Sequence, residues 1–148
     1  MNNRQIAEEF IKAMIKINKY MRGSKHDNEK NKLSSTDKQF RTLMYLKKVE
    51  KSPLKKLGEG LNVSKSSLCI MLNKMVENDL VKRETDSEDR RNTFYSLSEG
   101  GIKFLDEEID RRYNSLAENI GKKLGTEDRQ LFLESLKNIN LLMDKLAE

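Results

Sequence analysis

Charged side chains crowd into the stretch RETDSEDRRNTFYSLSEGG, residues 83–101, where Asp89, Arg90 and Arg91 stand side by side. An arginine can bind a phosphate or enter the narrow, strongly negative minor groove of DNA, and a nearby carboxylate can direct its guanidinium through a bidentate pair. The spacing of two residues predicts that Asp89 orients Arg91, while Arg90 or Arg83 contacts a phosphate. A charged turn that only improves solubility is the alternative interpretation.

A second candidate set lies on the segment from Lys65 to about Asn78, where apolar residues recur at helical spacing. The predicted buried face consists of Leu68, Met71, Leu72, Met75 and Val76. The opposite face could contact DNA, because serine, asparagine and lysine donate to phosphates and base edges, and small apolar groups touch thymine methyls. Asn73 in particular can pair with adenine. A polar face that is merely solvated is the alternative. The candidate residues, with the predicted cap, are Ser64, Lys65, Ser66, Ser67, Cys69, Ile70, Asn73 and Lys74.

Residue types that other chemistries need are missing or isolated. The chain has one cysteine, Cys69, and one histidine, His26, so neither an internal disulfide nor a local zinc pattern can form. No G-x-x-x-x-G-K-[ST] sequence occurs, and the segment from Gly58 to Gly60 lacks the third glycine of a dinucleotide loop. We therefore expect no catalytic activity, no metal and no cofactor.

The composition is that of one polar, helical domain. The 148 residues have a hydrophobic share of 36%, an equal charged share and a mean hydropathy of −0.80, which is common in helical proteins that complete their core by dimerising. Residues 1–51 contain 13 Lys and Arg against 6 Asp and Glu, which suits a polyanionic partner, although a solvated helical surface explains it as well. The chain has no long apolar run and no secretory signal, so we expect a cytoplasmic protein without membrane contact.

Hydrophobic spacing and capping residues predict the elements of the N-terminal half. A first helical stripe is followed by a polar loop over residues 22–32. Thr36, with Gln39 three residues later, predicts a capping box at the start of a second helix. Ser52 and Pro53 predict the start of a third helix, with the serine as its cap. The first stripe consists of Ile6, Phe10, Met14, Ile17 and Met21.

The C-terminal half is predicted in the same way. Asn62 tolerates the left-handed backbone that closes a helix, before the helix that Ser64 would cap. Residues 80–85 and 93–97 predict a β-hairpin. Ser98 predicts the cap of a long amphipathic helix, and Thr126 the cap of a last one. The apolar stripe of this last helix consists of Leu131, Phe132, Leu136, Ile139, Leu142, Met143 and Leu146.

The order helix, short turn, helix, hairpin is that of a winged helix-turn-helix. Its second helix enters the DNA major groove, and its hairpin, the wing, reaches the flanking backbone or minor groove. Gly58 suits this fold because helices that cross closely leave room for only a very small side chain; a casually tolerated glycine is the alternative. The predicted fold class is mainly α with a small β-hairpin wing.

The chain resembles the MarR family of winged helix-turn-helix transcriptional regulators. The resemblance rests on LGEGLNVSKSSLCIMLNKMVENDLVKRE, residues 57–84, and on DSEDRRNTFYSLSEGG, residues 86–101, with its Asp-Arg-Arg wing. The chain departs from the family pattern at a few positions. Asn62 and Asp79 replace glycines, Ser98 replaces a threonine, and Ile70 stands where an arginine is frequent.

The resemblance implies a homodimer formed by residues 1–35 and 98–148, with residues 36–97 as the DNA-binding lobe. Two-fold symmetry then implies a pseudo-palindromic operator in double-stranded DNA. The family also implies repression that a small, often aromatic ligand relieves. Two alternatives stay open: a winged helix that binds protein instead of DNA, favoured by Cys69 and Ile70, and a regulator that responds to oxidation of Cys69.

Overall fold

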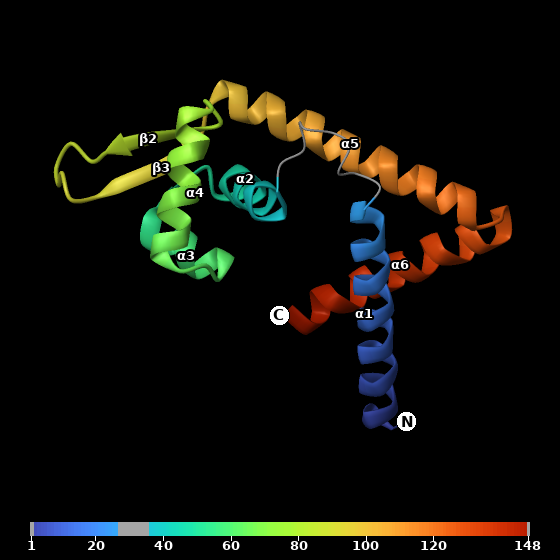
Figure 1. Ribbon diagram of the computed structural model, residues 1–148. Helices are drawn as coiled ribbons and strands as arrows, with labels where there is room; N and C mark the ends of the chain where they lie inside the picture. The colour runs from blue at the N-terminus through green and yellow to red at the C-terminus, as the bar shows by residue number, and fades with distance from the viewer. Residues whose placement is uncertain (1, 27–35, 148) are drawn as a thin grey trace. The chain divides into compact units, whose positions relative to one another are not determined.

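The computed structural model describes residues 2–26 and 36–147 (Figure 1). The chain divides into two units, residues 1–34 and 35–148. Helix α1 belongs to the first unit, and helices α2 to α6 with a small antiparallel sheet belong to the second. Within the described ranges, no helix is long and apolar enough to cross a membrane.

Helix α1 spans Asn3–His26 and confirms the first predicted helix. The predicted polar loop from Arg22 is wrong as far as His26, because the helix continues through these polar residues; residues 27–32 lie outside the described part. A single glycine, Gly23, costs a helix only about 1 kcal/mol and does not stop it. Seven large apolar side chains of α1 are 45% to 62% exposed. These residues are Ile6, Phe10, Ile11, Met14, Ile15, Ile17 and Met21.

Helix α2 spans Asp37–Val49 and begins with the predicted capping box. The Gln39 backbone N–H donates to the Thr36 hydroxyl at 3.3 Å, and the Thr36 N–H donates to the Gln39 side-chain oxygen at 3.1 Å. These two bonds satisfy donors that a helix start leaves open. Leu43 and Leu46 are fully buried and turn one face of α2 into the core.

The predicted helix start at Ser52 is wrong. Lys51–Pro53 forms a short edge strand, β1, in which Ser52 lies opposite Tyr95 and Pro53 opposite Phe94. Helix α3, Leu54–Leu61, begins directly afterwards, with Pro53 in the cap position and no capping side chain. Pairing with a distant strand outweighs the local preference for a helix start, and a proline is tolerated at a sheet edge.

The predicted turn between the two short helices, with Asn62 closing the first and Ser64 capping the second, is confirmed. Asn62 ends α3 in the left-handed region at φ 52°, and the Ser64 hydroxyl accepts from the Ser67 N–H at 3.4 Å to cap helix α4, Lys65–Glu77. Strands β2, Val81–Thr85, and β3, Thr93–Leu97, then form the predicted hairpin. The sheet order is β1-β3-β2, so β3 lies in the centre.

One hydrophobic core joins α2, α3, α4, the sheet and the start of α5. Leucines dominate this core because leucine is not branched at Cβ, which suits a helix, and because its side chain fills the space between packed helices. The predicted inward residues of α4 are fully buried at three positions, Leu68, Leu72 and Met75. The complete buried cluster comprises Leu43, Leu46, Leu57, Leu61, Leu68, Leu72, Met75, Val81, Tyr95 and Leu105.

Helix α5, Glu99–Lys123, starts in close contact with the end of α4. Ser98 caps it as predicted, accepting from the Gly101 N–H at 2.9 Å, and its hydroxyl donates to the Asp79 carbonyl. A Cβ atom on Gly101 would lie 1.8 Å from the Leu80 carbonyl oxygen, so only glycine fits there. Asp79 itself is left-handed at φ 55°, which explains why a glycine suits this position in the resembled pattern.

Helix α6 spans Thr126–Ala147. The prediction that Thr126 caps it is wrong, because Thr126 is its first helical residue and its hydroxyl accepts instead from the Arg129 guanidinium at 3.2 Å. None of the described residues of α6 is buried. Its amphipathic face is therefore not covered by the lobe.

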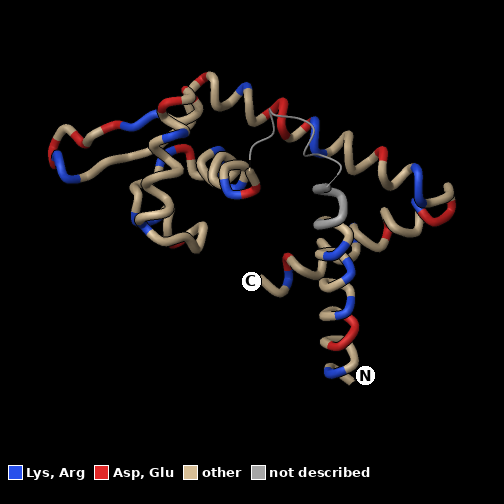
Figure 2. Tube along the Cα trace, viewed as in Figure 1, with Lys and Arg blue, Asp and Glu red and all other residues tan. Residues whose placement is uncertain are grey.

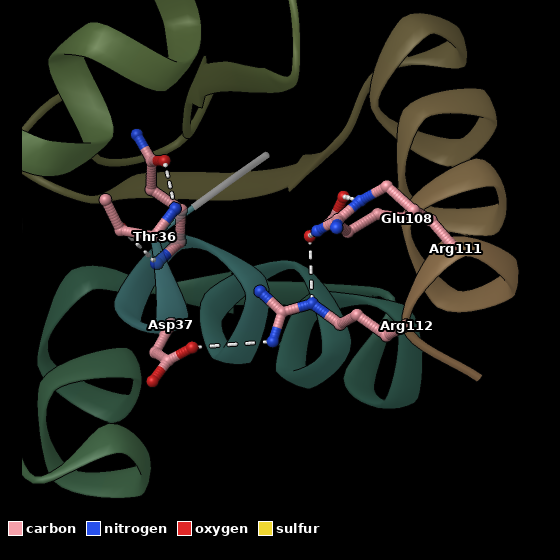
Figure 3. Close-up of polar contacts among 6 residues, drawn as sticks. Thr36, Asp37, Glu108, Arg111 and Arg112 are labelled. Carbon is pink, nitrogen blue, oxygen red and sulfur yellow. Dashed lines mark hydrogen bonds and ion pairs between the residues drawn. The ribbon is translucent and has the colours of Figure 1, made fainter. Parts of the chain in front are cut away.

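Arg112 on α5, held by the buried carboxylate of Glu108, contacts α2 (Figure 3). Glu108 is 3% exposed and accepts from Arg111 at 2.8 and 3.0 Å and from Arg112 at 2.8 Å. Arg112 also reaches Asp37 at 3.4 Å and lies 3.9 Å from the centre of the Phe40 ring, both on α2. Burial opposes the charge of Glu108, but the hydrogen bonds from Arg111 and Arg112 outweigh it and hold the pKa below its usual value.

Candidate nucleic-acid interface

The outward face of α4 is solvent-exposed along most of its length. Ser66, Asn73 and Lys74 are exposed, and so is Ile70, at 64%. The Ser64 hydroxyl caps α4 by accepting from the Ser67 N–H. It also lies 3.5 Å from the Ser66 hydroxyl. The remaining candidates divide by exposure: Lys65 and Ser67 are exposed, and Cys69 is half-buried.

Close contacts fix α4 at the surface of the lobe. A Cβ atom on Gly58 would lie 3.2 Å from the Val63 carbonyl, so the tight approach at this glycine is to the turn between α3 and α4; the 3.7 Å to a methyl of Leu68 on α4 is an ordinary van der Waals distance, and the predicted close crossing with α4 is not what requires this glycine. A Cβ atom on Gly60 would lie 2.5 Å from the Tyr45 ring on α2, a close approach that no local signal in the sequence predicts. Both glycines let α3 pack tightly on its neighbours while α4 keeps its outer face free.

The wing tip holds the predicted carboxylate–guanidinium pair. Asp89 Oδ1 accepts from the backbone N–H of Arg91 at 3.0 Å and from its Nε at 3.2 Å, while the Arg91 side chain stays 90% exposed. Hydrogen bonds from the Arg91 backbone and then from its side chain hold the pKa of the Asp89 carboxyl below its usual value. The pair therefore directs an exposed cation at the end of the wing.

The backbone around this pair is ordered by the turn itself. Asp86 N–H donates to the Asn92 carbonyl and Asn92 N–H to the Asp89 carbonyl, each at 2.9 Å. Arg90 lies next to Arg91 and is also exposed. Figure 2 shows acidic and basic residues interleaved along the backbone at this tip.

Arg83 does not lie at the tip. It lies in the middle of β2, beside α4, and its NH1 donates to Oδ1 of Asn73 at 3.3 Å. Two side chains that the sequence assigns to different parts of the interface thus form one contact. No spacing in the sequence predicts it, because it depends on how β2 runs past α4.

In residues 2–26 and 36–147, no group of His, Cys, Asp and Glu residues is arranged to hold a metal ion. Cys69 is a free thiol at the side of α4. The surface around α4 and the wing combines exposed donors with arginines, which is the chemistry of nucleic-acid contact.

Comparison with known proteins agrees with this geometry. Residues 35–93, from the start of α2 to the start of β3, match the MarR family. The organic hydroperoxide resistance transcriptional regulator of Bacillus subtilis is 31% identical over 101 residues, which cover 68% of this chain and 67% of the relative. The chain belongs to the MarR family. The HTH-type transcriptional regulator MhqR of Bacillus subtilis is 27% identical over 140 residues, which cover 92% of this chain and 94% of the relative.

Solved structures show the same fold. The YusO protein of Bacillus subtilis matches with a TM-score of 0.69 and 18% identity, over 95% of this chain and 98% of the other. A mutant of MepR from S. aureus bound to an oligodeoxyribonucleotide matches with a TM-score of 0.63 and 18% identity, over 90% and 97%. The predicted winged helix-turn-helix is confirmed, and this MarR-family protein is a DNA-binding transcriptional regulator.

Proposed function

We propose that this protein is a homodimeric, cytoplasmic repressor that binds a pseudo-palindromic operator and leaves it when a small, often aromatic ligand binds. The exposed face of α4 beside a wing with a directed arginine is the observation that carries this proposal. We further propose residues 36–97 as the DNA-binding lobe and residues 1–35 and 98–148 as the dimerisation region. In this scheme the protein supplies no cofactor and no catalytic step.

In the proposed complex, α4 lies in the major groove and the wing reaches the adjacent minor groove or backbone. Asn73 contacts a base edge, Lys65 and Lys74 contact phosphates, and Ile70 touches a thymine methyl. Arg91 enters the minor groove with Asp89 behind it, and Arg90 contacts a phosphate. Ser64, Ser66, Ser67 and Cys69 contribute to the same surface.

The dimer is supported by apolar faces that the single chain leaves exposed. A soluble monomer rarely carries large contiguous apolar patches, and a two-fold dimer covers such faces with copies of themselves. Helix α1 carries one of these faces and α6 the other. The exposed residues of the predicted α6 stripe are Leu131, Phe132, Ile139, Leu142, Met143 and Leu146.

A ligand releases the operator if it binds more tightly to a dimer conformation in which the two lobes do not fit DNA. A coupling of about 1–3 kcal/mol between the two sites would change operator affinity roughly 5–150-fold. The family resemblance supports this part of the proposal. Screening small aromatic acids and phenols for loss of binding to a selected duplex tests it.

Arg91→Ala tests the wing. We expect it to weaken binding to a duplex that the wild-type protein selects from a randomised pool, by about 5-fold or more if one directed charge contact is lost. Fluorescence anisotropy measures the affinity, and sedimentation shows that the dimer is intact. Arg129→Ala on α6 is the matched control, since it removes an arginine outside the proposed interface. Unchanged affinity of the Arg91 variant would remove the wing from the interface.

Exposed Ile70 supports a second candidate, a winged helix that binds a protein partner. Its side chain is 64% exposed in the middle of the groove-facing side, where it could pack against an apolar surface of a protein partner as well as against a thymine methyl. Anisotropy with random duplex at two salt concentrations separates the candidates, because phosphate contacts make the affinity fall steeply with salt. A protein that ignores every duplex at low salt would favour the second candidate.

A further inference from the structure

The contact between Arg83 and Asn73 joins the wing to the outward face of α4. Arg83 NH1 lies 3.3 Å from Asn73 Oδ1, and both side chains are exposed. Arg83 stands at the third position of β2, and Asn73 on the third turn of α4. The two elements pack against each other, so the contact spans a fixed junction.

This contact decides how the Asn73 amide is oriented. A guanidinium carries only donors, whereas an amide presents an oxygen on one side and an NH2 group on the other. Only the oxygen can face Arg83, because the NH2 group in its place would set donor against donor. The NH2 group of Asn73 is therefore turned away from the wing strand.

An amide held in this way retains what adenine recognition needs. In the major groove, adenine presents N7 as an acceptor and the N6 amino group as a donor, and asparagine pairs with both. The carbonyl oxygen has two lone pairs, so Oδ1 can accept from Arg83 and from adenine N6 at once, while Nδ2 donates to N7. Because Arg83 restricts the rotation of the Asn73 amide in the free protein, DNA binding has less side-chain entropy to remove.

We infer that Arg83 is a positioning residue that sets the base preference of Asn73, so that the wing strand takes part in reading a base it does not touch. The inference rests on the proposed function, since it requires α4 to lie in the major groove. A positioning role of Arg83 differs in its effect from a contact between Arg83 and a phosphate. A phosphate contact would strengthen binding to every sequence alike, whereas positioning acts on one base pair only.

Selection followed by base substitution tests the inference. Wild-type protein first selects its preferred sequence from a randomised duplex pool, and selection with Asn73→Ala identifies the position whose preference is lost. We expect adenine at that position, preferred over the other bases by about 5- to 150-fold. In Arg83→Met, which keeps the apolar stem, we expect this preference to fall below about 3-fold. In the double variant, adding Arg83→Met to Asn73→Ala should change the preference no further.

Lys82→Met is the matched control, because it removes a cation from the adjacent position of β2, whose side chain lies on the other face of the strand. It should keep the adenine preference. Full preference in Arg83→Met, with affinity lowered equally for all duplexes, would overturn the inference and leave Arg83 a phosphate contact. Preference for another base in the wild type would overturn it too. If the wild type enriches no sequence, the proposed function itself fails, which is a separate result.

Discussion

Leu72 on α4 is completely buried, whereas Leu142, the same residue type on the amphipathic helix α6, is 56% exposed. The contrast extends to the whole of each region. The lobe from α2 to the start of α5 has a closed leucine core, and α6 buries none of its described residues. The lobe thus has a core of its own, whereas the apolar face of α6 is not covered by the lobe. Four substitutions test this contrast.

Leu72→Ala should have the largest effect. Removing a fully buried leucine side chain costs about 2–5 kcal/mol, because the surrounding core collapses only partly into the cavity. Urea unfolding followed by circular dichroism measures the loss. The loss should be the same at every protein concentration if the lobe's core lies within one chain. A loss below about 1 kcal/mol would contradict a closed core in the lobe.

Glu108→Gln should come next, at about 1–3 kcal/mol at pH 7, because the guanidinium groups of Arg111 and Arg112 lose the charge of Glu108, and only Arg112 has another carboxylate, that of Asp37, in contact. The folded pKa of Glu108 is lowered, so its stabilisation is present above the unfolded pKa of about 4.3 and is lost as the pH falls through the folded value. The difference between wild type and variant should therefore shrink below about pH 4. Urea midpoints across this range measure it. An equal difference at pH 7 and in acid would contradict a charged Glu108.

Leu142→Ala should act only on association. We expect the dissociation constant of the dimer to rise about tenfold, equivalent to about 1.4 kcal/mol, with little change in the helix content of the dimer. Analytical ultracentrifugation measures it. Leu141→Ala is the matched control, since Leu141 is 57% exposed but lies off the predicted stripe. Equal effects of the two variants would show that the stripe does not define the interface.

Ser64→Ala should have the smallest effect, a loss of about 1 kcal/mol, because the Ser67 N–H would lose its capping oxygen. Thermal unfolding measures it. Ser64→Gly should cost only a few tenths of a kcal/mol and serves as the comparison. If the alanine variant is as stable as the wild type, the cap contributes nothing to α4.

Local signals in the sequence predicted most of the lobe. The Thr36 capping box, the left-handed Asn62 and the Ser64 cap each depend on residues within a turn of one another, and all are confirmed. The pair of Asp89 and Arg91 was predictable for the same reason. Local spacing is not sufficient everywhere, since the caps that it predicted at Ser52 and Thr126 are wrong.

Contacts between distant segments were not predictable. Strand β1 exists because Ser52 meets Tyr95, and nothing near Ser52 indicates that partner. The contact of Arg83 with Asn73 and the tight fit of Gly60 against Tyr45 depend likewise on how elements pack. The roles of the interface residues in DNA binding remain predictions, because they depend on a molecule outside the chain.

The close fit of Gly101 under Leu80 has a mechanical consequence. Together with the bond from the Ser98 hydroxyl to the Asp79 carbonyl, it clamps the first turn of α5 onto the exit of α4. A hinge at residues 97–98 would have to break this clamp. A tilt of the first turn of α5 would therefore move α4 and the wing with it, and in the proposed dimer a change in the separation of the two lobes would have to start farther along α5 than these contacts.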